Sequence, residues 1–331
     1  MARIAKLLRS TLASVAGPLA ALILAVIIVS LSTDRFLMPR NLANVSLQVS
    51  SVAIAAIGAT LVILTGGIDL SPGAVVALSS CTLAILVKNM GLPVEVGILL
   101  VLVLGAVLGF VNGFLSTYGR IPSFVVTLAT MSAYRGLAFL ITNGSPIFSI
   151  APGLEPVFYG TFLGLPLPLY YVIVLYLITL VFLRYTIPGR AIYAVGGNES
   201  AARLSGIHVN RTRLLTFILA GLTAAIAGIL TTARLDSGSP NYGVGTELQA
   251  IAAAVIGGAS LTGGHGNIIS TLFGALTVAV VQNGLNLNIV PSSWQEITLG
   301  AIIVLAVGVD MWRASITHSL SRWIPALRRQ T

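Results

Sequence analysis

The chain has 331 residues, of which 56% are hydrophobic and only 8% are charged, and its mean hydropathy is +0.99. About a quarter of the residues of a soluble domain are charged, so this composition excludes a soluble globular protein and indicates an integral membrane protein. The formal net charge of +9 would suggest nucleic acid as the partner of a soluble protein. In a membrane protein the basic residues instead mark the loops that face the cytoplasm, so we expect membrane lipid and no nucleic acid around this chain.

Apolar runs close to the ~20 residues that a membrane-spanning helix needs recur along the whole sequence. In chain order they predict ten spans, at 15–33, 44–65, 71–88, 94–117, 122–142, 168–185, 213–233, 248–261, 267–286 and 294–312. Two short ones adjoin the glycine-rich segments GGIDLSPG (66–73) and GGASLTGGHG (257–266), where we expect broken or re-entrant helices. The sequence therefore predicts one all-α integral membrane domain over residues 1–331, with about ten transmembrane helices.

The N-terminal sequence MARIAKLLRS precedes the first apolar run and imitates a signal peptide, with a basic start and an apolar stretch. The apolar run is long for a signal peptide, and no persuasive small-x-small cleavage site follows it. We interpret the run as the first anchored helix, and cleavage is the alternative.

The distribution of Lys and Arg sets the predicted topology. With the N-terminus in the cytoplasm, only four of these residues fall on outer segments, one lies within a span, and the basic C-terminus is on the inner side. The residue within a span is Arg135, and the outer ones are Arg35, Arg40, Lys88 and Arg234. This bias predicts a multi-pass protein with both termini in the cytoplasm.

The stretch AVGGNESAARLSGI (194–207) interrupts the apolar runs with the signals of a short, water-facing helix. Two glycines end what we expect to be an extended lead-in, and Asn198 is a good N-cap. Glu199 and Arg203 suit the positive and negative ends of the helix dipole, and Gly206 is placed for a left-handed C-cap. The pattern predicts a helix of under two turns.

This short helix lies in the most basic inner loop, about 186–212. A helix of that length is not stable in water by itself, so something must hold it. Either it packs along its own membrane domain as an interfacial helix, or a soluble partner receives it in a groove.

A search for catalytic motifs favours a partner. The two lysines, Lys6 and Lys88, do not follow a glycine, so the chain has no GxxxxGK[ST] phosphate-binding loop, and it also lacks HExxH, CxxC and GxSxG motifs. The single cysteine, Cys81, has no partner for an intrachain disulfide. We therefore expect no enzyme activity, no catalytic residue, and no metal or cofactor in this chain.

Four segments resemble the permease (transmembrane) subunit of ribose-type monosaccharide ABC importers, and the resemblance runs in order over about 40–310. They are VILTGGIDLSPGAVVAL (62–78), IPSFVVTLATMSAYRGLAFLITNGSPI (121–147), GRAIYAVGGNESAARLSGIHV (189–209) and ELQAIAAAVIGGASLTGGHGNIISTLFGAL (247–276). The resemblance implies a bacterial inner-membrane permease that dimerises with a second copy or a homologous permease. Its implied partners are a cytoplasmic ABC ATPase, which binds ATP and Mg, and a periplasmic sugar-binding protein.

In that family the loop that resembles 196–207 is the coupling helix, which seats in the ATPase. The resemblance therefore implies polar contacts with the ATPase from Glu199 and Arg203 and packing contacts from Ala202 and Leu204, between the caps Asn198 and Gly206.

Residues for a translocation path or gate are polar groups in or beside the spans. Asp69 is read first as a turn and cap before Ser71 and Pro72, and otherwise as a substrate contact. A charge within a span needs a partner or a watery cavity, so Arg135 either lines the path or donates to helix-end carbonyls. A neutral sugar needs hydrogen-bond donors and acceptors, and the neutral candidates are Asn112, Thr127, Asn143, Gln282 and Asn283.

On the outer side, charged residues are candidates for docking the binding protein by complementary charge. They are Arg234, Asp236 and Glu155. Ordinary solvation at the surface is the alternative for each.

We therefore expect a permease subunit that moves a monosaccharide, ribose or a similar pentose, into the cytoplasm by alternating access. The same machine could carry another sugar, a sugar-derived signal or a nucleoside. An ion-coupled secondary transporter is a different possibility, but such proteins usually have acids inside their spans and the interiors of these spans have none. A structural membrane protein is disfavoured by Arg135 and the broken helices.

Overall fold

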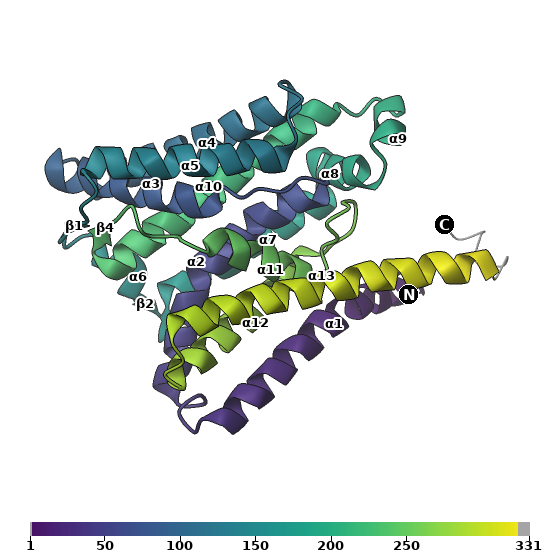
Figure 1. Ribbon diagram of the computed structural model, residues 1–331, viewed down its shortest axis with the longest axis horizontal. Coiled ribbons are helices and arrows are strands. Elements are labelled where there is room, and N and C mark those ends of the chain that lie inside the picture. Colours follow the sequence, from purple (N-terminus) through teal and green to yellow (C-terminus); the bar gives the residue numbers. More distant parts are fainter. Residues whose placement is uncertain (1, 324–331) are drawn as a thin grey trace.

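The structure is a computed structural model that describes residues 2–323, with side chains for 15–308 (Figure 1). Long helices run side by side along one axis of the molecule, with short helices and strands at the two ends. The predicted all-α membrane fold is confirmed.

Each predicted span corresponds to a helix in the described part of the chain. These helices are α1 (Ala2–Ser32), α2 (Pro39–Leu64), α3 (Pro72–Ala84) with the π-helical turn η1 (Ile85–Asn89), α4 (Val94–Thr117), α5 (Ser123–Thr142), α7 (Leu167–Tyr185), α10 (Val209–Leu235), α11 (Thr246–Ile256), α12 (Ile268–Leu287) and α13 (Ser292–Trp323). The second span begins five residues earlier than expected, because Pro39 occupies the first helical turn, where its missing N–H is not needed.

The helices α2, α3 and α10 form the buried centre, whereas α1, α4, α5 and α7 expose broad apolar faces. Small residues let the helices approach closely, as lipid-embedded helices require. At the crossing of α4 and α10, a Cβ on Gly105 would overlap the carbonyl of Gly221, and a Cβ on Gly221 would overlap the carbonyl of Gly105. Both positions therefore need glycine.

The broken helices expected near the glycine-rich segments are present. Residues 65–71 are non-helical between α2 and α3, and residues 257–267 are non-helical between α11 and α12. The span expected at 248–261 is shorter than predicted: α11 ends at Ile256 and has 11 residues, or about 16 Å of helix, which cannot cross a ~30 Å hydrocarbon core alone. A buried, non-helical segment that includes Ser237–Gly238 leads into α11 and lies inside the bundle.

The loops gather at two opposite ends of the bundle (Figure 1). At one end, β1 (Ile147–Phe148) pairs with β4 (Ser237–Gly238), β2 (Thr161–Phe162) pairs with β3 (Leu165–Pro166), and α6 (Glu155–Tyr159) covers the end of α10. The other end holds α8 (Ile187–Gly197) and α9 (Glu199–Leu204), and the start of α1 and the end of α13 point the same way. This arrangement matches an even number of crossings.

The lead-in to the short helix differs from the prediction. Residues before Asn198 form the helix α8 instead of an extended strand, and both glycines belong to its last turn. Thr186 caps the start of α8 by accepting a hydrogen bond from the N–H of Gly189. A sequence signal for this helix, threonine followed by proline, was present at Thr186 and Ile187–Pro188.

Candidate functional site

The helix α9 has the caps that the sequence predicts. The Asn198 Oδ1 accepts a hydrogen bond from the N–H of Ala201 at 2.9 Å. At the other end Gly206 is left-handed, with φ +81°, and the N–H of Ile207 donates to the carbonyl of Ala202. Local backbone chemistry therefore sets both boundaries of this two-turn element.

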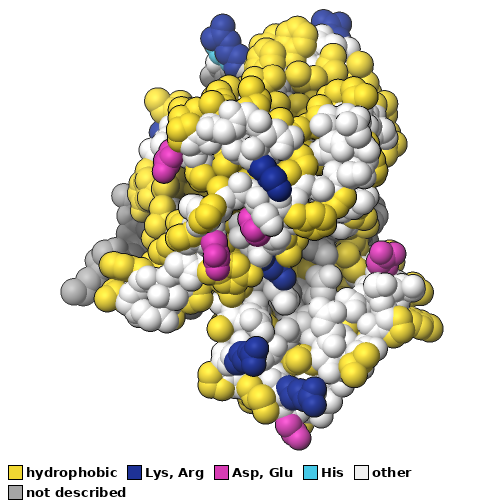
Figure 2. Space-filling view, turned by 90° about the vertical axis from the view of Figure 1, so that its left-hand side faces the viewer, with side chains coloured by type: hydrophobic (Ala, Val, Ile, Leu, Met, Phe, Trp, Pro, Cys, Tyr) yellow, Lys and Arg dark blue, Asp and Glu magenta, His cyan; other side chains and the backbone are white. Residues whose placement is uncertain are grey.

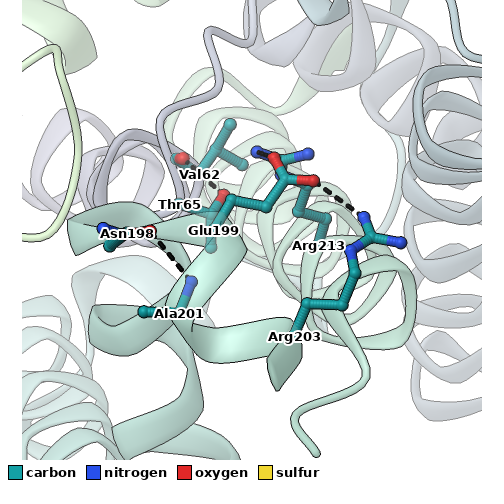
Figure 3. Close-up of polar contacts among 7 residues, drawn as sticks. All are labelled: Val62, Thr65, Asn198, Glu199, Ala201, Arg203 and Arg213. Atoms are coloured by element: carbon teal, nitrogen blue, oxygen red, sulfur yellow. Dashed lines mark hydrogen bonds and ion pairs between the residues drawn. The ribbon is translucent and has the colours of Figure 1, made fainter. Parts of the chain in front are cut away.

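Glu199 joins α9 to the body of the protein (Figure 3). Its two carboxylate oxygens each lie 2.9 Å from a guanidinium nitrogen, one on Arg203 and one on Arg213 of α10. The hydrogen bond from Arg203, with further help from Arg213, holds the pKa of Glu199 below its usual value. The pairing of Glu199 with Arg213 cannot be predicted from the sequence, because 14 residues separate them and no local periodicity indicates it.

The structure also shows which side chains of α9 are buried and which are exposed. Ala202 is 4% exposed and packs against Val195 and Val209 of the same chain, so its side chain faces the permease itself, and a packing contact with a partner stays a prediction. Leu204 is 90% exposed, and Arg203 is exposed beside it. Leu204 is therefore an apolar side chain of α9 that the chain itself leaves uncovered. The chain itself therefore holds one face of α9, and the other face, with Leu204, is exposed; binding of that face by a soluble partner stays a prediction.

Three glycine segments from distant parts of the chain meet beneath α9. A Cβ on Gly196 would overlap the carbonyl oxygen of Leu64, at the end of α2, and would approach the backbone N–H of Gly264. That N–H donates a hydrogen bond to the Leu64 carbonyl at 2.9 Å, and a Cβ on Gly263 would press on the backbone of Gly66. The two similar glycine-rich motifs thus lie side by side, with the end of α8 packed on both.

Asp69 lies at the turn that follows this contact and is 4% exposed. Its Oδ1 accepts hydrogen bonds from the N–H and the hydroxyl of Ser71, which is the turn that the sequence favours, although the Ser71 side chain makes no capping hydrogen bond to α3. The Asn112 amide of α4 donates to the Ser71 hydroxyl at 2.8 Å, and the Tyr134 hydroxyl of α5 donates to the carbonyl of Leu108 on α4. The turn between α2 and α3 is therefore tied to α4 and α5.

Thr127 belongs to the same region. Its hydroxyl donates within α5 to the carbonyl of Ser123 at 2.9 Å, and it approaches the carbonyl of Ile68 at 3.3 Å. Ser123 in turn accepts from the N–H of Ile68. The structure therefore brings Asp69, Asn112 and Thr127 together, on the side of the bundle that carries α9.

Arg135 bonds to the non-helical segment that leads into α11. Its Nη1 donates to the carbonyl oxygens of Pro240 at 2.8 Å and Tyr242 at 2.6 Å. The acid whose charge acts most on Arg135 is Glu247, in the first turn of α11, although no ion pair within 4.0 Å joins these two residues. Arg135 therefore supports an irregular backbone at membrane depth, which requires such donors.

The other path candidates do not join this cluster. The Gln282 and Gln249 amides bond to each other at 3.2 Å, and the amides of Asn283 and Asn41 exchange hydrogen bonds of 2.9 and 3.1 Å between α12 and α2. Asn143 is the left-handed C-cap of α5 at the far end. These contacts are interhelical or capping uses, and a place on the path stays a prediction for all seven residues.

The three docking candidates lie at the end opposite α9. The Asp236 carboxylate accepts from the N–H of Ile150 at 3.0 Å, and the Arg234 carbonyl accepts from the Tyr159 hydroxyl at 3.0 Å. Glu155 begins α6 over the same helix end. Viewed from this end, basic and acidic side chains are interspersed among apolar ones (Figure 2). Docking at this face stays a prediction.

The sequence of the chain is similar to those of known transport proteins. Residues 41–307 match the family described as "Branched-chain amino acid transport system / permease component". The chain is 45% identical to the ribose import permease protein RbsC of Bacillus subtilis over 89% of its length and 92% of that protein, and 44% identical to RbsC of Escherichia coli K12 over 88% and 92%. The xylose transport system permease protein XylH of Escherichia coli K12 is 34% identical over 88% and 90%.

No solved structure matches the chain. The family match covers nearly all the membrane helices and includes both glycine-rich motifs, the cluster around Asp69 and the whole of α9. The chain belongs to the permease component family of these transport systems.

Proposed function

We propose that this chain is the membrane permease of an ABC importer that carries ribose into the cytoplasm, driven by a separate ATPase. The observation that carries the proposal is the 40–45% identity to ribose import permeases over nearly the full length of both chains. The xylose permeases are more distant, at 34%, so a pentose is the supported class and ribose its first member.

In the proposed mechanism α9 receives the force of the ATPase. The exposed side chains of Leu204 and Arg203 form the surface that contacts the ATPase. Glu199 holds α9 to α10 through its ion pair with Arg213. Movement of α8 and α9 reaches the end of α2 through the backbone contact of Gly196 with Leu64. The turn at Asp69 then transmits this movement to α4 and α5. These two helices switch the permease between outward and inward openings.

From this assignment we infer the orientation of the chain in the membrane and its partners. The end with α9, the start of α1 and the end of α13 faces the cytoplasm, as the bias of Lys and Arg favours. The opposite end, with Glu155, Arg234 and Asp236, receives a periplasmic sugar-binding protein. A second permease completes the translocation path, and ATP and Mg bind to the ATPase.

The test is reconstitution of the permease in vesicles with the ATPase and binding protein encoded by neighbouring genes. Labelled ribose should accumulate against its gradient, with ATP inside the compartment that corresponds to the cytoplasm. Omission of the ATPase should abolish accumulation. Ribose movement that is equally fast without the ATPase would identify a self-sufficient carrier and overturn the proposal.

Competition by unlabelled sugars tests which pentose the permease carries. An excess of unlabelled ribose should suppress uptake more strongly than an excess of unlabelled xylose. Stronger suppression by xylose would keep the importer but reassign its cargo.

A further inference from the structure

A long groove runs between α1, α12 and α13, and residues of α7, of α8 and of the glycine-rich segment 257–266 also line it. Its volume is about 1450 Å³, and most of its lining is apolar, with Leu24, Ile28 and Leu305 among the side chains that face it. On α1 the lining extends from Gly17 to Ser32, which corresponds to about 22 Å along the helix axis. The groove therefore exceeds the depth of one leaflet of a bilayer, about 15 Å.

The two mouths of the groove differ in charge. At the mouth near α9, Arg184 and His265 line the groove and are both exposed. The Arg184 guanidinium lies 5.8 Å from the centre of the Tyr185 ring, and the Tyr193 hydroxyl beside it donates to the carbonyl of Gly266. The opposite mouth has the neutral Ser32 and Asn288, and no Asp or Glu lines the groove among the residues whose side chains the structure describes, 15–308.

An apolar groove with a base at one mouth is complementary to a molecule that has an apolar chain and an anionic group. An acyl chain packs its methylenes against the apolar lining by van der Waals contact, as it does in the bilayer, and a phosphate at the mouth pairs with a guanidinium. A sugar would leave its hydroxyls unpaired against the apolar lining. Basic pockets between membrane helices on the cytoplasmic side are a known form of anionic lipid site.

We propose that the groove between α1, α12 and α13 binds an anionic phospholipid of the cytoplasmic leaflet, with its phosphate at Arg184 and His265 and an acyl chain against α1 and α12. The lipid fills the space between α1 and the bundle, so it stabilises the position of α1. The site is independent of the transported sugar.

The experiment is native mass spectrometry of the purified permease after exchange into equal amounts of phosphatidylglycerol and phosphatidylethanolamine. The wild-type chain should retain phosphatidylglycerol in preference. Arg184→Gln should lower that preference about fivefold, as expected for the loss of one base near a lipid surface at about 1 kcal/mol. Arg190→Gln is the matched control, because Arg190 is exposed at the same end but does not line the groove.

A second variant tests the trough itself. Ala21→Trp places a large side chain in the groove and should reduce retention of both lipids while the chain stays folded, as thermal unfolding will show. Unchanged preference in Arg184→Gln, or unchanged retention in Ala21→Trp, would overturn the site. Rapid disulfide cross-linking between two copies of Ile28→Cys would also overturn it, because that result would place a second permease in the groove; the native Cys81 is buried.

Discussion

Gly196 packs its backbone on the carbonyl of Leu64, although 132 residues separate them in the sequence, and a side chain at Gly196 would occupy the position of that oxygen. A Cβ added at the neighbouring Gly197 would meet nothing within 4 Å. The end of α8 therefore rests directly on the end of α2, with no side chain between them to absorb a movement. This contact joins the exposed α9 to the membrane helices.

Replacement of Gly196 tests the contact. Gly196→Ala should lower the free energy of unfolding by about 1–3 kcal/mol, because the new methyl group overlaps backbone that cannot move aside. It should also reduce ATP-driven transport. Gly197→Ala in the same helical turn should change stability by no more than about 0.5 kcal/mol. Thermal unfolding in detergent and uptake in vesicles measure both, and equal behaviour of the two variants would contradict a direct backbone contact.

Leu204 should contribute to partner binding and not to folding. Because its side chain is 90% exposed, Leu204→Ala should leave the unfolding temperature of the permease unchanged. It should weaken binding of the ATPase about tenfold, as expected for an apolar anchor in an interface. Leu163→Ala removes a leucine that is 84% exposed at the opposite end and serves as the control. Unaltered ATPase affinity in Leu204→Ala would exclude this face of α9 from the interface.

Glu199 should show a dependence on pH with a definite sign. Its pKa is lowered by the hydrogen bond from Arg203 and by Arg213, so its contribution is fully present above its ordinary value of 4.5 and is lost as the pH falls below 4.5 through the lowered pKa. The two ion pairs are partly exposed, so Glu199→Gln should cost under about 1 kcal/mol at pH 7. The difference in unfolding temperature between wild type and Glu199→Gln should shrink in acid. A difference that grows in acid would contradict the assignment.

The same substitution should disturb coupling more than stability. Without the hydrogen bond that Arg213 donates to the Glu199 carboxylate, α9 loses its ionic link to α10. We expect transport per ATP hydrolysed to fall in Glu199→Gln while the ATPase still binds. Arg211→Gln, which removes an exposed base of the same loop that makes no ion pair within 4.0 Å in the described chain, is the control.

Arg135 should be sensitive to a change that keeps its charge. Arg135→Lys retains a cation but lacks the planar fork of the guanidinium, so it cannot reproduce the hydrogen bonds to Pro240 and Tyr242 with the same geometry. We expect a loss of about 1–3 kcal/mol of stability. Ser132→Ala, an exposed neighbour on α5, should change little. Faster thiol labelling of Asn241→Cys in the Arg135→Lys background would show that the segment before α11 is released, and unchanged labelling would argue against that support.

The sequence alone determined the spans other than the one predicted at 248–261, the alternation of loops and the caps of α9. Hydropathy depends on composition within a window of about 20 residues, and the caps depend on groups within four positions, so both can be predicted locally. The tertiary structure decided that Ala202 faces inward, that Arg213 reaches Glu199, that Arg135 supports a segment more than 100 residues away, and that two glycine motifs meet at Leu64. These contacts depend on how helices cross in three dimensions, and a glycine chosen for close packing has the same appearance in a sequence as one chosen for a turn.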